Sequence, residues 1–527
     1  MASTVLNVTQ ERIRFGGTAK MVLIGLMVLG AICLGLSGIE SIGGEFHDGR
    51  FWTNYLHNTI FFTGVAFMML FFLAAMYLAY SGWHVVFKRV LEAYSLFLPI
   101  GLLLMIPIIA GVWLHWHHIY HWAAPGITET DKIIAGKSGF LNPTFFTVFS
   151  LVVMAFFAFY AFKIRGISVK EDEEGTKEYS FYRKLKVNSG IFLPIAGFTS
   201  AGIIWLWVMS IDPHWYSTLY AWYATASWLV AAIAMIILTI IFLKFSGYFS
   251  FVSDEHLHDL GKYLFGFSVF WTYLWFSQYM LIWYSNVGEE TIYFQQRQEQ
   301  YPVLFWANLA INFILPFFVL MRNSTKRRFG TLGFVAAMLV FGHWLDYYQM
   351  IKPGAHLAYH EHALHSDHHG DDHHDAEGAH SSVGHGGADH HGNDNQDHGD
   401  EHHGGEHHSD GHHGDPDDTT LSTESETASP SDGVGGMMYP GDTDETASAA
   451  VGDRNYGRGD NIYADTVKEH HEPPAYAAGW NIPGLLELGT FAGFLAGFIF
   501  VGLLGLDRAG LYPVNDPYLA ESTHHHV

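Results

Sequence analysis

The stretch TIFFTGVAFMMLFFLAAMYLAY, residues 59–80, decides the class of this chain, because it carries no charged side chain over its whole length. An α-helix needs ~20 apolar residues to cross a bilayer. Similar stretches recur along the 527 residues, so the sequence predicts an all-α integral membrane protein with ten transmembrane helices. The predicted spans are Gly17–Gly38, Thr59–Tyr80, Val90–Val112, Pro143–Phe162, Gly190–Ser210, Ala221–Leu243, Gly261–Trp283, Pro302–Leu320, Gly330–Met350 and Leu485–Leu506.

The basic residues predict the orientation of these spans. Cytoplasmic loops of membrane proteins carry an excess of Lys and Arg. One set of alternate loops, together with the N-terminus, is rich in both, whereas the first four loops of the other set hold only Arg50, Lys132, Lys137 and Arg297. We therefore expect a multi-pass membrane protein with both termini in the cytoplasm.

Four regions follow from this topology. Residues 1–351 form a membrane domain with nine helices, residues 352–483 a periplasmic insert, residues 484–506 the tenth helix and residues 507–527 a cytoplasmic tail. The insert is dominated by His, Asp, Gly and Glu and has few aliphatic residues, so it cannot bury a core and is predicted to be disordered.

The histidine pairs of the insert are weak candidates for metal ligands. Imidazole suits Zn, Cu and Ni, and the clearest pairs are His368 with His369 and His373 with His374. The alternative is a soluble spacer, because His-rich tracts bind metals weakly whether or not this is their role.

Cysteine usage limits the cofactors. Cys33 is the sole cysteine, which excludes a C-x-x-C-H haem attachment site and a Cys-ligated iron–sulfur cluster. We expect the chain to bind no cofactor on its own. If it serves redox chemistry, the electron carriers must lie in partner subunits.

Polar residues inside membrane spans point to function, because they are costly in lipid. His343, Asp346 and Tyr347 stand at i, i+3 and i+4 and so share one helix face. We place Asp346 about one helical turn inside the outer boundary. The pair His343–Asp346 is our first candidate for proton transfer, and a structural hydrogen bond between helices is the alternative. We expect His343 and Asp346 to be coupled to each other or to a polar group from another helix, for which Tyr284, His117 and Asp212 are the candidates.

Other candidates for proton transfer or quinol binding gather near the same predicted face. Asp212 and His214 lie in a turn ended by Pro213, and an aromatic-belt turn with a capping Asp explains them equally well. The aromatic-rich segment 271–284 suits a flat quinone ring, although membrane interfaces use the same residues as anchors. The remaining members of the set are Gln278, Tyr284, Glu289, His117 and His57.

Three motifs resemble a known family. WTYLWFSQYMLIWYSNVGEE (271–290) is similar to the seventh-helix signature of polysulfide-reductase/NrfD-type membrane subunits. DPHWYST (212–218) and GHWLDYY (342–348) resemble the second such subunit of alternative complex III, the bacterial quinol:electron-acceptor oxidoreductase. The tail NDPYLAES (515–522) is also similar, whereas the insert has no counterpart.

The resemblance implies the bacterial plasma membrane and two four-helix bundles, helices 2–5 and 6–9, flanked by helices 1 and 10. It also implies partner subunits: a sister NrfD-type subunit, a multihaem c-type cytochrome and an iron–sulfur protein. A menaquinone-like quinol is the implied substrate, better supported for the sister subunit than for this chain. The expected role is therefore in the membrane arm, with proton conduction near the periplasmic face. A metal-ion transporter with a metal-trapping loop and a purely structural subunit remain the alternatives.

Overall fold

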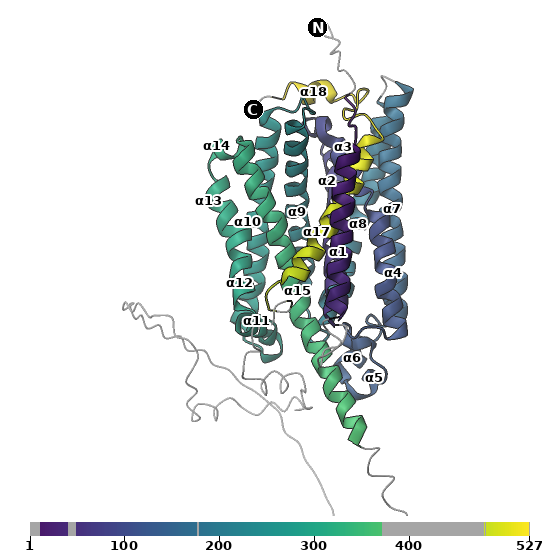
Figure 1. The fold of residues 1–527 in the computed structure, drawn as a ribbon, viewed down its shortest axis with the longest axis vertical. Coiled ribbons are helices and arrows are strands. Elements are labelled where there is room, and N and C mark those ends of the chain that lie inside the picture. The colour runs from purple at the N-terminus through teal and green to yellow at the C-terminus, as the bar shows by residue number, and fades with distance from the viewer. Residues whose placement is uncertain (1–10, 40–48, 176–178, 372–478, 480, 526–527) are drawn as a thin grey trace, which may run out of the picture. The chain divides into compact units, whose positions relative to one another are not determined.

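The structure, a computed structural model, describes residues 11–39, 49–175, 179–371, 479 and 481–525. Long helices run side by side through this part of the chain, and no β-strand forms within it (Figure 1). Nine of these described helices are long and apolar enough to cross a membrane. The chain is an all-α integral membrane protein, as its sequence predicts.

The first half of the chain forms five long segments and the short elements between them. Helix α7 begins at Pro143, because proline suits the first helical position and the side chain of the N-cap residue Asn142 accepts a hydrogen bond from the Phe145 amide. The elements are α1 (Gly17–Ile39), α2 (Gly49–Leu78), η2 (Trp83–Phe87), α3 (Lys88–Ser95), α4 (Leu98–Leu114), η3 (His121–Ala123), α5 (Ile127–Thr130), α6 (Lys132–Lys137), α7 (Pro143–Glu174), α8 (Ser180–Trp207) and η4 (Met209–Ile211).

The second half contributes the remaining long helices and an amphipathic connection, α11. Its elements are α9 (Thr218–Phe245), α10 (Asp254–Ser285), α11 (Gly288–Gln300), α12 (Pro302–Leu309), η5 (Ala310–Ile314), α13 (Leu315–Leu320), α14 (Asn323–Lys326), α15 (Phe329–Asp371), α17 (Leu485–Asp507) and α18 (Leu519–Thr523).

Helix α10 contains the predicted seventh span, Gly261–Trp283. At 32 residues it is as long as α7, and it packs against α9 and α13. It is not among the nine helices that qualify as spans by length and apolarity. Its many Trp, Tyr and Ser residues are less apolar than the aliphatic residues of the other helices, which explains the difference.

The helices form two groups with one flanking pair. Helices α2, α3–α4, α7 and α8 contact one another, as do α9, α10, α12–α13 and α15, and α2 joins the groups through α9 and α15. Helices α1 and α17 pack against each other beside them. The pair meets at Gly30 and Gly493, where a Cβ on Gly30 would lie 2.5 Å from the Gly493 Cα, so only glycine permits this approach.

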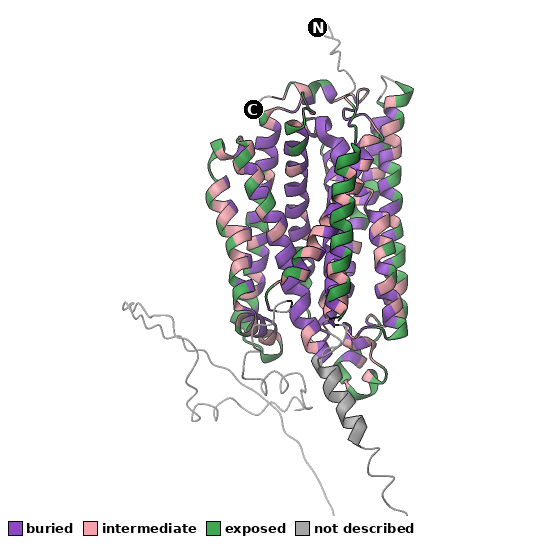
Figure 2. Cartoon of the chain, viewed as in Figure 1, coloured by how far each residue is buried: buried purple, intermediate pink, exposed green. Residues whose placement is uncertain are grey.

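Burial identifies the centre of the helix assembly. Helices α2 and α9 bury 89% and 83% of their most apolar windows, whereas α1 buries 11% (Figure 2). Polar groups on α2 and α9 are therefore held inside the protein, and α1 presents its apolar side chains outward. We name the two ends of the assembly after short helices that lie there: the α11 end, with α5, α6 and α11, and the α18 end, with α14 and α18 (Figure 1).

Helix α15 differs from the predicted ninth span. It continues through Pro353 to Asp371, whereas the sequence predicts an end at Met350 and an insert from Lys352. Lys352 is fully buried and donates to the Thr53 hydroxyl at 2.7 Å, and Ala355 and Tyr359 are buried as well. Neighbouring helices can re-satisfy backbone groups freed by proline, which is why the helix tolerates it. The rest of the predicted insert up to residue 478 lies outside the described residues.

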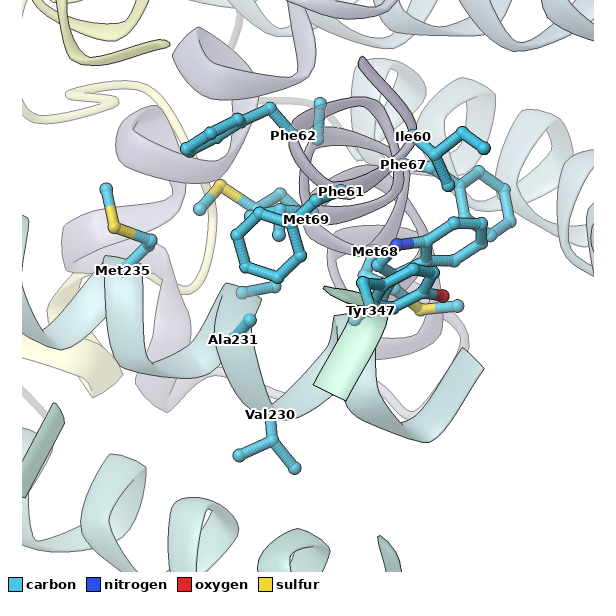
Figure 3. Close-up of a cluster of buried hydrophobic side chains, with 14 of the residues drawn as sticks. Ile60, Phe61, Phe62, Phe67, Met68, Met69, Val230, Ala231, Met235 and Tyr347 are labelled. Atoms are coloured by element: carbon cyan, nitrogen blue, oxygen red, sulfur yellow. The ribbon is translucent and has the colours of Figure 1, made fainter. Parts of the chain in front are cut away.

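A dense apolar layer fills the middle of the assembly. Phe61, Phe62, Met68 and Met69 of α2 pack there against Val230, Ala231 and Met235 of α9 (Figure 3). Along α9 this layer lies between Ser227 on the α11 side and Thr239 on the α18 side, both buried and polar. Every residue of α9 between these two positions is apolar.

Candidate functional site

Asp346 is the centre of a buried polar network. It lies on α15 and is fully buried. Its carboxylate accepts three hydrogen bonds from other helices: from the Tyr223 hydroxyl of α9, from Trp271 Nε1 of α10 at 2.9 Å, and from Asn308 Nδ2 of α12 at 2.7 Å. All three donors are neutral. One acid thus ties together the four long segments of the second helix group.

His343 lies beside Asp346, as the i, i+3 spacing predicts. Its Nδ1 is 4.0 Å from Asp346 Oδ2 and 2.9 Å from the Ser227 hydroxyl of α9. The edge of the Trp271 ring meets the imidazole face at 5.4 Å between centroids. His343 Nε2 has no hydrogen-bond partner within the described residues. The expected coupling to Tyr284, His117 or Asp212 is wrong, because the partners come from Tyr223, Ser227, Trp271 and Asn308 instead.

The other polar residues of this motif and of α2 serve packing. The Tyr347 hydroxyl donates to the Ala224 carbonyl at 2.9 Å, and its ring stacks on Trp228 at 5.4 Å. The His57 Nε2 lies 2.9 Å from the Trp344 carbonyl, and Trp344 Nε1 donates to Asn58 at 3.0 Å. Tyr347 and His57 therefore fasten α15 to α9 and α2 rather than face Asp346.

Asn308 and Asn312 extend the network, and neither is among the residues predicted from the sequence. Asn312 Nδ2 donates to the Asn308 side-chain oxygen at 2.5 Å and to the Gly342 carbonyl at 3.0 Å. Asn312 lies in η5, a π-helical turn that precedes Pro316. Proline removes one backbone donor, and π-turns are frequent at functional sites. The signal was available, since two asparagines four residues apart inside an apolar span must face the protein interior.

A small cavity adjoins the network on the α11 side. Its volume is about 20 Å³, and polar groups of Tyr223, Gln278, Arg297 and Gln349 line it. Gln278 is buried, and its Nε2 finds no partner among the described residues. A polar cavity above ~10–15 Å³ has room for one water molecule. A water here can bridge Gln278 to its neighbours, whereas a quinone ring does not fit.

Asp212 closes this region at the α11 end. It is buried and paired with Arg297 Nη2 at 3.1 Å, and the guanidinium lies 3.3 Å from the centre of the Tyr293 ring. A Cβ on Gly354 of α15 would lie 2.5 Å from Asp212 Oδ1, so glycine lets the carboxylate approach α15. Burial raises the pKa of Asp212, and Arg297 opposes that shift. Gly354 is eight residues from Asp346, about 12 Å along the helix.

His214 has a separate partner. It forms an ion pair with Asp131, which also caps α6 by accepting from the Ile133 and Ile134 amides. Burial alone would raise the pKa of Asp131, but the His214 hydrogen bond and the two amides outweigh it, and the pKa is lowered. The predicted residues Asp212 and His214 are thus neighbours in sequence that belong to different contacts.

His117 is a structural residue. It folds back over the end of α4, with Nε2 3.0 Å from the Ile108 carbonyl, and its ring packs against Trp52. Burial lowers the pKa of His117 to about 4, so the imidazole is neutral at physiological pH. Tyr284 and Glu289, by contrast, are exposed at the end of α10 and the start of α11, and neither lies in the Asp346 network.

The described residues hold no group of three or more His, Cys, Asp or Glu side chains that could bind a metal ion. His368 and His369 lie on the last turns of α15, where no side chain is described, and His373 and His374 lie outside the described residues.

A second buried charge cluster, at the α18 end, differs in kind. Lys88 pairs with Asp516 of the C-terminal tail, and Arg89 pairs with Glu92 at 2.6 Å and with Asp172. All five side chains are at most 9% exposed. Here each acid has a cation in direct contact, so the arrangement is that of an ionic clamp between α3, α7 and the tail.

Fold and site together define a polytopic membrane protein with a buried acid in a neutral hydrogen-bonding shell. No protein-family model matches the chain, and no curated protein sequence matches it.

Proposed function

We propose that this chain is the membrane-arm subunit of a respiratory quinol:electron-acceptor oxidoreductase and that Asp346 exchanges protons within it. The assignment to such a complex is supported by the motifs at residues 212–218, 271–290 and 342–348. Haem c and iron–sulfur clusters belong to the partner subunits in this proposal, and quinol is oxidised in the sister subunit.

The Asp346 shell is the observation that carries the proton role. An ionised carboxylate in a low-dielectric interior is costly unless hydrogen bonds or a cation stabilise it. Asp346 has three neutral donors and, at 4.0 Å, one imidazole, so both of its protonation states can be accommodated. A fully paired acid such as those at the α18 end lacks this freedom.

The path from Asp346 leads toward the α11 end. Tyr223 contacts Asp346 and also lines the small cavity with Gln278 and Arg297, and Arg297 holds Asp212. A water in that cavity completes a chain of groups that can relay a proton. In the other direction the face of α9 toward α2 is apolar, as Figure 3 shows. The proposal is therefore exchange between Asp346 and one face of the membrane.

The rival functions receive less support. A metal-ion transporter requires ligands that converge within the helices. The part of the chain that the structure describes offers no such group. A purely structural subunit has no need of a buried acid such as Asp346, whose hydrogen bonds all come from neutral groups.

The test is Asp346→Asn in the complex purified through a tag on this chain. Such a preparation should contain haem from partner subunits, and the absence of haem would refute the assignment to the complex. Quinol-driven turnover per assembled complex should fall at least tenfold, or its pH profile should shift, because the amide cannot exchange a proton. Asp507→Asn is the matched control, since Asp507 accepts from the Phe15 amide at the end of α17.

The structural alternative makes the opposite forecast. If Asp346 only clamps four helices, the variant should lose thermal stability while specific activity stays unchanged over the whole pH range. That outcome would remove the proton role from Asp346.

A further inference from the structure

A second region has the shape of a ligand site and meets the path from Asp346 at Asp212, a lining residue whose carboxylate is paired with Arg297. A cavity of about 260 Å³ lies at the α11 end, where Trp205, Met209, Trp215 and Tyr216 form apolar walls and Lys137 forms part of the rim. A second cavity of about 140 Å³ lies between α8 and α9, lined among others by Gly197, Ala201 and Trp222.

The two cavities follow one another along α8. Gly197, Ala201 and Trp205 are spaced by four residues and so form one row on the helix surface. The first two line the inner cavity, and the third lines the outer one. The row covers about 12 Å along the axis. The two cavities are separate, and this row of α8 links them into one apolar surface groove, which we take as the candidate site.

The outer end of the groove carries hydrogen-bond donors. Lys137 is half-buried; its Nζ donates to the Pro213 carbonyl at 2.6 Å and lies 5.2 Å from the centre of the Tyr216 ring. No described carboxylate forms an ion pair with it. The buried indole N–H groups of Trp205 and Trp215, two residues that line this cavity, find no acceptor among the described residues. Burial lowers the pKa of Lys137, and Asp131 offsets part of that shift.

We propose that this groove binds one phospholipid, with its phosphate at Lys137 and an acyl chain along the row from Trp205 to Gly197. Three features favour this occupant. A half-buried ammonium without a carboxylate partner is complementary to a phosphodiester, and basic pockets between transmembrane helices bind lipid head groups. Small residues at the inner end leave room for a methylene chain, and the aromatic walls are apolar. The outer cavity also lies beside the end of α8, at the α11 end of the helices.

The test measures lipid retention by the isolated complex. After detergent delipidation the complex is incubated with phosphatidylglycerol, and bound lipids are counted by native mass spectrometry. Lys137→Gln removes the charge at the head, and Gly197→Leu fills the inner cavity. A Cβ at Gly197 meets nothing within 4 Å, so this substitution should not disturb the fold. Both variants should lose one tightly bound phospholipid per chain.

A control variant and two contrary outcomes test whether the groove binds a phospholipid. Lys132→Gln changes an exposed lysine of the same short helix and should retain the lipid. Equal lipid counts in wild type, Lys137→Gln and Gly197→Leu would overturn the proposal and leave only bulk lipid contact. If solvent extraction shows that the retained molecule is a quinone and that it is lost in both variants, the groove is a quinone site and the phospholipid assignment is wrong. None of these outcomes depends on Asp346 or on turnover.

Discussion

The Asp346 network and the α18-end clamp are both buried, and both join several helices, yet their buried carboxylates are stabilised by different groups. Asp346 is satisfied by a hydroxyl, an indole and an amide. The acids of the clamp touch Lys88 and Arg89 directly. Protonation of a directly paired acid leaves a cation unpaired, whereas an acid in a neutral shell can gain a proton without that cost. The difference separates a candidate for proton exchange from a structural element.

The clamp should give the largest loss of stability. Arg89→Met removes the cation between Glu92 and Asp172 and leaves two buried acids near each other. Removal of one partner from a buried pair costs about 3–5 kcal/mol. We expect a strongly lowered midpoint of thermal unfolding in detergent and a poor yield of folded protein. Arg89→Lys, which keeps the charge, should recover part of the loss.

Asp346→Asn should cost less. The amide keeps the shape of the carboxylate, but its NH2 group replaces one accepting oxygen and faces a hydrogen-bond donor. Such a mismatched buried hydrogen bond costs about 1–3 kcal/mol. If Asp346→Asn destabilised the chain more than Arg89→Met, the distinction between clamp and exchange site would fail.

The half-buried pair of Asp131 and His214 at the α11 end should matter still less. The pKa of Asp131 is lowered in the folded state, so its stabilising contribution is present above its unfolded pKa of ~3.9 and is lost as the pH falls through the folded value. Asp131→Asn keeps the cap on α6 but removes the charge opposite His214. It should lower stability by less than about 1 kcal/mol at pH 7, and by progressively less as the pH falls through the folded pKa.

Hydrogen exchange at the Ile133 and Ile134 amides of α6 provides the measurement. Asp131→Ala also removes the cap on α6. The exchange rate should therefore rise further, and the free energy of protection of these amides should fall by about 1 kcal/mol. A larger effect at low pH than at pH 7 would contradict the linkage argument.

The sequence predicts the class of fold well and the site only in part. The membrane spans can be predicted because each is a continuous run of apolar residues. The shared face of His343 and Asp346 can be predicted because it depends only on their spacing along one helix. The partners of Asp346 come from α9, α10 and α12, and their approach depends on how each helix is rotated about its axis. Nothing in the sequence near Asp346 contains that rotation. Tyr284 was chosen for its position at a helix end, yet it faces outward.

The end of α15 shows a second limit. Pro353 and the polar residues after it favour a helix end in water, where nothing replaces the lost hydrogen bond. In the structure Lys352 contacts Thr53 and Gln296 donates to the Pro353 carbonyl at 3.3 Å, so tertiary contacts hold the helix through the proline. Such contacts become visible only when α2, α11 and α15 lie together.

The smallest effect is expected from a deletion within the insert. Deletion of residues 376–470 keeps the described part of α15 and all of α17, whereas a cut at Lys352 would remove the buried residues Ala355 and Tyr359. A segment so poor in aliphatic residues contributes little burial, so the unfolding midpoint and the turnover of the complex should stay unchanged. Thermal unfolding and turnover at matched haem content measure both. Loss of turnover that added Zn²⁺ or Cu²⁺ restores would instead assign the histidine pairs a metal-linked role and would make the insert a third functional region beside the network and the clamp.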